Sequence, residues 1–290
     1  MKFDKNTKIL IVGLGLIGGS YAKALSDEGY FVGAIDKKKS SVEYALKNGL
    51  IQVGETSVKK DFVKDFDLIV FALYPHDFIN WIKEYQSSIK SGALITDVTG
   101  VKSFVVENVQ KILRDDLEFV GAHPMAGKEV SGVENSDPKI FVGANYIVTP
   151  TKRNTDENVQ AVKDLGRALG FERISSLSPE EHDETVGFLS HLTHCIAVSL
   201  MVSKKSHHLA EYTGDSFRDL TRIAKINDEM WSELFLANKD ELLKQMDLFE
   251  EKFNQLKEDI KNDNREKIRE TLRESTARRK VFDKDAKETK

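Results

Sequence analysis

The chain has 290 residues, a length that suggests two domains. Its 43 basic and 47 acidic residues leave a net charge of −4, so a strongly cationic nucleic-acid-binding protein is excluded and an anionic membrane partner is not expected. The single cysteine, Cys195, rules out an intramolecular disulfide and a cysteine-built metal site, which fits a reducing, cytoplasmic location. No stretch approaches the roughly 18 apolar residues of a membrane span, and we expect none.

In the first half of the chain, short apolar strands alternate with helical stretches. The expected strands are Ile9–Val12, Phe31–Ile35, Leu68–Leu73, Ala93–Val98, Phe119–Ala122 and Asn145–Val148, and the expected helices are Ser20–Ser26, Val42–Lys47, Phe78–Ile89 and Ser103–Leu113. Continuous apolar strands between helices predict parallel pairing with both faces of the sheet covered. This is the pattern of a doubly wound, mostly parallel α/β domain.

After Pro150 the pattern becomes mainly helical. We expect a helix up to Leu169 and a short strand near Phe171–Ile174, and Ser178 followed by Pro179 and two glutamates is a strong helix start. Further helices are expected at about 216–226, 230–262 and 264–280, with a charged, frayed end at Lys280–Lys290. The second half therefore indicates an all-helical domain.

A glycine motif follows the first strand and opens the first helix. Gly13 permits a tight turn, Gly15 lets the backbone approach a pyrophosphate, and Gly18 lets helix and strand pack closely. Bare N–H groups at the helix start, where Leu16 and Ile17 lie, suit the phosphates. We therefore predict a Rossmann-type NAD-binding domain over residues 1–176, followed by the helical domain over residues 177–290.

Asp36 ends the second strand, where an acid accepts hydrogen bonds from ribose hydroxyls and disfavours a 2′-phosphate. It favours NAD over NADP, although Lys37, Lys38 and Lys39 could offset a phosphate charge. The turns after the third and fourth strands, with Leu73, Tyr74 and Thr99, should line the nicotinamide end, because ligands of such sheets bind beyond the carboxyl ends of the strands.

His123 ends another expected strand, a suitable place for an acid–base group beside a nicotinamide ring. Ser190 and His194 lie four residues apart on one helix, as do Arg218 and Arg222, whose guanidinium groups suit a substrate with carboxylates. We expect no metal site, because a zinc pair of His191 and His194 has imperfect spacing and lacks the acid of an H-E-x-x-H motif.

Taken together, these motifs resemble the prephenate and arogenate dehydrogenases of tyrosine biosynthesis, from the Gly13 motif to Trp231. The resemblance implies NAD-linked oxidative decarboxylation of prephenate or arogenate, with His123 as the catalytic base and Arg222 as the group that binds the ring carboxylate. It assigns the substrate pocket to Ser190, His194, Arg218, Asp219 and Trp231, with Glu129 at its mouth. It also implies a homodimer through the helical domain, with tyrosine as a possible inhibitor.

One departure from the family pattern affects His123. The fourth-strand turn usually carries Ser before Val-Lys, whereas this chain has Gly100. The hydroxyl that would polarise the histidine or contact the nicotinamide must then come from Thr99 or from water, or be absent. We expect activity to rise with pH through a group near the ordinary histidine pKa of about 6.5.

Two rival functions and one choice of substrate remain open. A β-hydroxyacid dehydrogenase would need a catalytic lysine in a G-x-x-G-x-G-x-x-x-K frame, which is absent, and an NAD-sensing binding module would not need His123. The residues do not decide between prephenate and arogenate.

Overall fold

The computed structural model describes residues 1–205 and 208–282, in two compact units, Met1–Lys239 and Asp240–Lys290. Residues 283–290, part of the expected frayed end, lie outside the described residues. The first unit holds both sheets and all of the site residues predicted above.

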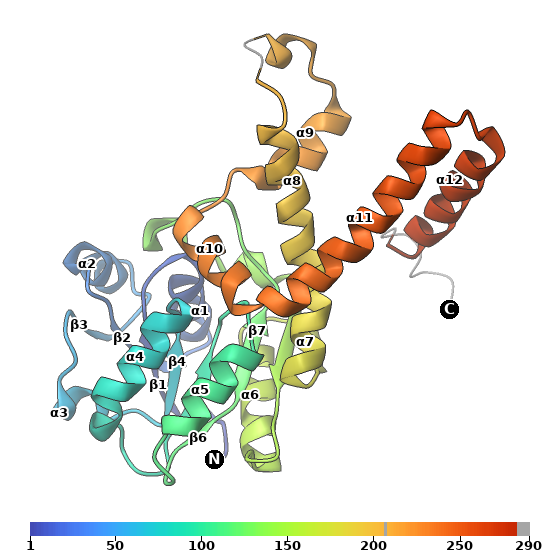
Figure 1. The fold of residues 1–290 in the computed structure, drawn as a ribbon. Coiled ribbons are helices and arrows are strands. Elements are labelled where there is room, and N and C mark those ends of the chain that lie inside the picture. The colour runs from blue at the N-terminus through green and yellow to red at the C-terminus, as the bar shows by residue number, and fades with distance from the viewer. Residues whose placement is uncertain (206–207, 283–290) are drawn as a thin grey trace. The chain divides into compact units, whose positions relative to one another are not determined.

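The main sheet of the first unit is parallel and doubly wound (Figure 1). Its strands are β1 (Lys8–Val12), β2 (Phe31–Ile35), β3 (Val53–Glu55), β4 (Leu68–Phe71), β5 (Leu94–Asp97) and β6 (Glu118–Phe119). Their order is β3-β2-β1-β4-β5-β6, and every neighbouring pair is parallel. The predicted fold class is confirmed. The strand β3 was not predicted, because a three-residue edge strand around Gly54 leaves little apolar pattern.

Helices cover both faces of this sheet. They are α1 (Leu16–Asp27), α2 (Lys39–Lys47), α3 (Lys60–Val63), α4 (Pro75–Tyr85) and α5 (Ser103–Ile112), with a short 3₁₀ turn at Gln86–Ser88, whereas α6 (Asp156–Ala168) packs on strands of a second sheet. Ile9 and Ile11 of β1 join the core under α1, α2 and α6, whereas Leu10 and Val12 join the core under α4 and α5. The strand sequences are continuously apolar because successive side chains enter two different cores.

A second sheet of three strands corrects two predictions. It consists of β7 (Gly121–Pro124), β8 (Asn145–Thr149) and β9 (Arg173–Ser176), with β7 antiparallel to β8. The expected strand Phe119–Ala122 is therefore split, and Asn145–Val148 does not join the parallel sheet. Asp97 lies at the split, because its side-chain Oδ1, and not a backbone carbonyl of β5, accepts the N–H of Ala122 at 3.0 Å.

The other regular elements of residues 1–205 and 208–282 are helices. They are α7 (Pro179–Val186), a π-helical turn η4 (Gly187–Leu192), α8 (Thr193–Val202), α9 (Asp215–Thr221), η6 (Arg222–Ala224), α10 (Asp228–Ala237), α11 (Lys239–Lys261) and α12 (Arg265–Arg279), with 3₁₀ turns at Val133–Asn135, Pro138–Phe141, Leu209–Tyr212 and Lys280–Phe282. The capping box at Ser178 is confirmed, because Ser178 and Glu181 exchange side-chain to backbone hydrogen bonds.

Two of the predicted helices are shorter than expected. The one at 216–226 changes to 3₁₀ geometry at Arg222, and the one at 230–262 breaks at Asn238. The Asn238 side chain explains the second break, because it donates to the carbonyl oxygen of Asp183 at 2.9 Å and contacts Nδ1 of His191 at 3.3 Å. The boundary predicted at residue 177 stays a prediction, and the two compact units divide the chain elsewhere, after Lys239.

Among the described residues, one helical run is long and apolar enough to cross a membrane, which corrects our expectation that no run approaches that length. This run is Pro179–Val202. It meets the criteria of length and composition only, and the core helices of soluble proteins meet the same criteria. This run includes the buried side chains of His182 and Asp183.

Candidate active site

The glycine loop between β1 and α1 has three glycines with three different surroundings. Gly13 has φ +99°, and a Cβ there would collide with the carbonyl oxygen of Ala72. A Cβ on Gly18 would collide with the carbonyl oxygen of Gly13, whereas a Cβ on Gly15 would meet no protein atom within 4 Å. Gly13 and Gly18 are thus required by the fold, and the space at Gly15 is open to a ligand.

The start of α1 suits an anion. Gly15 is its N-cap and offers no side-chain hydrogen bond, and the first turn contains no acidic residue. The N–H groups of the first turn, at Leu16 and Ile17, have no partner within the helix, and the helix dipole favours negative charge there. These residues therefore fit the pyrophosphate of a dinucleotide.

Asp36 is fixed by two backbone amides. Its Oδ2 accepts from the N–H of Leu14 at 2.6 Å and its Oδ1 from the N–H of Lys38 at 2.7 Å. A carboxylate has about four acceptor positions, so these bonds leave lone pairs for ribose hydroxyls. Lys39, one of the lysines that could offset a phosphate, pairs with Glu43 at 3.4 Å.

The turn after β4 contacts the helical residues of the same unit. Leu73 and Tyr74 are half-buried there, burial raises the pKa of Tyr74, and its hydroxyl accepts from Asn227 at 3.3 Å. The backbone N–H and the ring Nδ1 of His76 both lie 2.6 Å from Oε1 of Glu233. The loop expected beside the nicotinamide is therefore anchored to α10.

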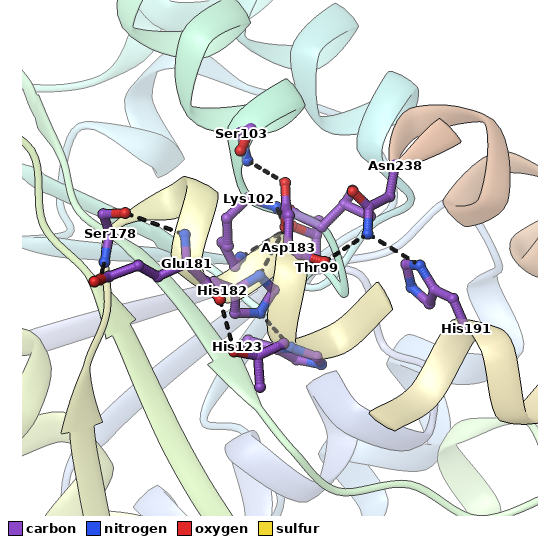
Figure 2. Close-up of polar contacts among 12 residues, drawn as sticks. Thr99, Lys102, Ser103, His123, Ser178, Glu181, His182, Asp183, His191 and Asn238 are labelled. Carbon is purple, nitrogen blue, oxygen red and sulfur yellow. Dashed lines mark hydrogen bonds and ion pairs between the residues drawn. The ribbon is translucent and has the colours of Figure 1, made fainter. Parts of the chain in front are cut away.

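His123, half-buried at the end of β7, is the first member of a chain of polar contacts (Figure 2). Its Nδ1 lies 2.8 Å from Nε2 of His182, and Nδ1 of His182 lies 2.7 Å from Oδ1 of Asp183. The Asp183 carboxylate also accepts the backbone N–H groups of Lys102 and Ser103, each at 2.8 Å, at the start of α5.

The surroundings of these groups set their charges. Burial, followed by the neighbouring His182, Lys102 and His191, lowers the pKa of His123 well below 6.5, so its ring is neutral at pH 7. Burial also lowers the pKa of His182, although the hydrogen bond to Asp183 opposes this. Burial would raise the pKa of Asp183, but the hydrogen bonds from His182, Lys102 and Ser103 outweigh it, and the carboxyl stays ionised.

The structure does not bring Thr99 to His123. The single hydroxyl proton of Thr99 faces Asp97 and the carbonyl oxygen of Val101, and its oxygen accepts from Nζ of Lys102 at 3.0 Å. Lys102 itself is fully buried, 2.5 Å from Asp97, and its pKa is lowered by burial. The hydrogen-bond partner of His123 is instead His182.

A second group of predicted residues gathers around the π-helical turn η4. The ring of His194 stacks on Trp231 with 3.7 Å between centroids, and its Nδ1 donates to the carbonyl oxygen of Ser190 at 2.8 Å. Isolated π-helical turns frequently occur at functional sites. The structure thus brings Ser190, His194 and Trp231 together.

Arg222 and Glu129 form an ion pair, although 93 residues separate them in the sequence. Burial lowers the pKa of His194, and both charged groups act on it, Arg222 lowering and Glu129 raising it, so all three lie in one electrostatic neighbourhood. By contrast, Arg218 is exposed and pairs with Asp215 at 3.2 Å, and Asp219 is exposed beside it on α9. Arg222 and Glu129 therefore join the His194 group, while Arg218 has a partner on its own helix.

Sequence reasoning missed His182, Asp183 and Asn238. A signal for the first two was present: the apolar face of α7 includes Pro179 and Val186, and helical spacing puts His182 and Asp183 on that buried face. Ionisable residues on a buried helix face need partners inside the fold, which marks them as candidates.

The fold and site define an oxidoreductase with a Rossmann-type nucleotide-binding domain. Two family models match the chain: "Prephenate dehydrogenase, nucleotide-binding domain" over residues 21–173 and "Prephenate dehydrogenase, dimerization domain" over residues 178–274. The chain belongs to the prephenate dehydrogenase family.

Three similar proteins agree with this assignment. A prephenate dehydrogenase of Bacillus subtilis is 34% identical over 249 residues, which cover 82% of this chain and 66% of that protein. A cyclohexadienyl dehydrogenase of Zymomonas mobilis is 29% identical, covering 96% of both chains. The crystal structure of prephenate dehydrogenase from A. aeolicus in complex with hydroxyphenyl propionate and NAD+ is 34% identical, with a TM-score of 0.87 over 96% of this chain and 98% of that one.

Proposed function

We propose that this chain catalyses the NAD-dependent oxidative decarboxylation of prephenate to 4-hydroxyphenylpyruvate, a step of tyrosine biosynthesis. The observation that carries the proposal is the position of His123, whose Nδ1 lies 2.8 Å from Nε2 of His182, in the same unit as the glycine loop and Arg222. Oxidation of a ring hydroxyl needs a base for the proton beside a hydride acceptor.

His123 is the proposed base. Because its pKa lies below the ordinary value, the ring is neutral at pH 7, and its unprotonated nitrogen takes the proton of the substrate's ring hydroxyl. As the hydroxyl carbon becomes a carbonyl, the ring carboxylate leaves as carbon dioxide and the ring becomes aromatic. The gain of aromaticity and the loss of carbon dioxide drive the reaction in one direction.

Arg222 orients the departing carboxylate in this proposal. Its guanidinium pairs with Glu129 in the ligand-free chain, and a substrate carboxylate would compete for the same donors. Binding the carboxylate too tightly would oppose its loss, so the role of Arg222 is orientation. The proposed pocket also includes Ser190, His194, Arg218, Asp219 and Trp231.

The glycine loop fits NAD because the space beside Gly15 is free of protein atoms and the N-terminus of α1 is bare. When bound, NAD would supply the hydride acceptor. The residues that would hold it are Gly13, Gly15, Leu16, Ile17 and Gly18 at the pyrophosphate, Asp36 at the ribose, and Leu73, Tyr74 and Thr99 at the nicotinamide end. Because Asp36 would repel a 2′-phosphate, turnover with NAD should exceed turnover with NADP.

Arogenate is the second candidate substrate, and the similarity to a cyclohexadienyl dehydrogenase over 96% of both chains favours testing it. We further propose a cytoplasmic homodimer that associates through residues 177–290, with residues 1–176 as the NAD-binding domain. The match to a dimerization domain over residues 178–274 supports the homodimer. Tyrosine, which shares the hydroxyphenyl ring and the carboxylate of the product but has an amino group in place of the keto group, is a proposed inhibitor at the same pocket.

The deciding experiment follows NADH absorbance with purified protein, NAD and either prephenate or arogenate, with NADP and added tyrosine in separate arms. Turnover of prephenate supports the proposal, and faster turnover of arogenate would replace it with the second candidate. No NADH from either substrate would reject both. A short β-hydroxyacid serves as the control substrate and should give no NADH.

A further inference from the structure

The hydrogen bonds among His123, His182 and Asp183 allow only one arrangement of the protons on the two imidazole rings. The Asp183 carboxylate, ionised and bonded to two backbone N–H groups, is an acceptor only, so the proton between it and His182 belongs to Nδ1 of His182. A neutral histidine with its proton on Nδ1 has a bare Nε2. That bare nitrogen faces Nδ1 of His123 at 2.8 Å, so Nδ1 of His123 must be the donor.

We propose that His182 and Asp183 are positioning residues that hold His123 in its Nδ1–H tautomer and leave its Nε2 free to accept the substrate proton. The catalytic consequence rests on the proposed function, whereas the tautomer itself is a property of the ligand-free protein. In the other tautomer Nε2 would carry a proton, and the ring could not act as the base.

The two positioning residues are themselves held firmly. Both side chains are buried. Asp183 lies against the N-terminus of α5, and Asn238 donates to its backbone carbonyl at 2.9 Å (Figure 2). Nε2 of His182, the acceptor for Nδ1–H of His123, is therefore fixed in one position, and general base catalysis requires such fixed geometry.

The same chain stabilises the proton once it is transferred. When Nε2 accepts it, His123 becomes a cation, and its bond to His182 becomes charge-assisted and stronger. Asp183 lies at the far end of this chain as a negative charge. The nearby positive charge of Lys102 is paired with Asp97 at 2.5 Å, and His191 is neutral because its pKa is lowered to about 4.

Neither Thr99 nor Gly100, in the turn after β5, provides a hydrogen-bond partner for His123. Thr99 directs its hydroxyl to Asp97 and Val101, and Gly100 has no side chain, although a Cβ there would lie 3.9 Å from Cε1 of His123. The hydrogen-bond partner of His123 is therefore provided from α7, by His182.

The test combines kinetics with a direct view of the ring protons. His182→Phe keeps a ring of similar size but removes the acceptor, and it should lower kcat roughly tenfold to a hundredfold while leaving KM for prephenate within about twofold. His182→Gln places an amide oxygen near the former Nε2 and should retain more kcat than His182→Phe. In ¹⁵N-histidine-labelled wild-type protein without substrate, the His123 signals, assigned from their loss in His123→Asn, should have the Nδ1–H pattern.

Ser178→Ala is the matched control, because it removes the side-chain cap of α7 and leaves the side chains of His123, His182 and Asp183 unchanged. It should lower Tm and leave kcat and KM of the folded enzyme unchanged. An Nε2–H pattern for His123 in the wild type, or a His182→Phe variant with wild-type kcat, overturns the inference. Equal kcat values for the Phe and Gln variants do so as well. If the wild type turns over neither prephenate nor arogenate, the proposed function fails, and the ring spectrum still decides the tautomer.

Discussion

Replacing His123 with asparagine removes the proposed base while keeping a polar side chain at the end of β7. General base catalysis contributes about 10²–10⁴-fold, so kcat should fall by that factor while prephenate binds nearly as well. Steady-state kinetics measure the first effect and calorimetric titration of prephenate measures the second. A His123→Asn enzyme with wild-type kcat would mean that another group is the base.

The pH profile of the wild type should depart from that of an ordinary histidine. Because burial, followed by the neighbouring His182, Lys102 and His191, lowers the pKa of His123, its ring stays neutral below pH 6.5. A base is active above its pKa, so kcat/KM should stay level down through pH 6.5 and decline only at lower pH. This revises our expectation of a rise near 6.5, and a decline centred at or above 6.5 would contradict it.

Arg222→Ala should chiefly raise KM. Loss of a charged hydrogen-bonding partner costs about 1.5–3 kcal/mol, which is roughly tenfold to a hundredfold in affinity for the ring carboxylate. Its ion pair with Glu129 is exposed, so Tm should change little. KM from initial rates and Tm from calorimetry check the two halves of this prediction.

Arg218→Ala is the internal control for Arg222, since Arg218 is exposed and pairs with Asp215 on its own helix. It should raise KM less than Arg222→Ala does. The reverse order of effects would show that the two arginine roles have been exchanged. A lower Tm with unchanged KM for Arg222→Ala would mean that this residue serves the fold.

At the scale of elements, the turn from β1 into α1 separates residues that serve the fold from one that serves the ligand. Gly15→Ala adds a methyl group where no protein atom lies within 4 Å, at a backbone φ of −90° that alanine tolerates. The fold should be unaffected, but the methyl group would displace the pyrophosphate from the helix N-terminus. KM for NAD should rise roughly tenfold to a hundredfold with Tm unchanged.

Gly18→Ala is the matched contrast, because its methyl group would collide with the carbonyl oxygen of Gly13. That variant should lose stability, seen as a lower Tm or poor folding. If Gly15→Ala lowered Tm as Gly18→Ala does, the free space at Gly15 would be structural, and the assignment of the pyrophosphate site would be wrong.

The elements that were predictable are those whose pattern is local. The strands β1, β2 and β4 are apolar over most of their length and β5 begins with two apolar residues, and Ser178 with Glu181 marks the start of α7 in four residues. The failures depend on contacts between distant segments. The carboxylate of Asp97 lies at the split of the expected strand Phe119–Ala122, and the side chain of Asn238 ends α10 by bonding to α7. No local pattern contains those partners.

The candidate site divides in the same way. His123, Ser190, His194 and Arg222 stand in recognisable motifs, and the structure gathers the last three with Glu129 and Trp231. His182, in contrast, reaches His123 only because α7 lies against β7 and the start of α5, 59 residues away in sequence from the histidine it supports. A hydroxyl was expected for that task, and the fold provides an imidazole instead.

At the scale of the whole molecule, the second unit has an apolar face that its own described residues leave open. Along α11 exposed apolar side chains recur at helical spacing at Leu243, Met246, Phe249, Phe253 and Ile260, and Leu248 is exposed as well. Phe249 and Phe253 stack with 5.9 Å between ring centroids, although Phe253 is 59% exposed. Contiguous exposed apolar surface of this kind marks an interaction site, and the match to a dimerization domain over residues 178–274 makes a second copy the expected partner.

Wild-type protein should therefore sediment with twice the mass of the 32.8 kDa chain, and Phe253→Glu should shift it toward the monomer. An unpaired charge buried at an interface costs about 3–5 kcal/mol, enough to weaken association more than a hundredfold. Leu46→Glu is the matched control, because Leu46 is a comparably exposed apolar residue on α2 of the nucleotide-binding domain, and it should leave the mass unchanged. Analytical ultracentrifugation over a range of concentrations measures all three proteins. A monomeric wild type, or a Phe253→Glu protein that remains a dimer, would show that α11 does not form the interface.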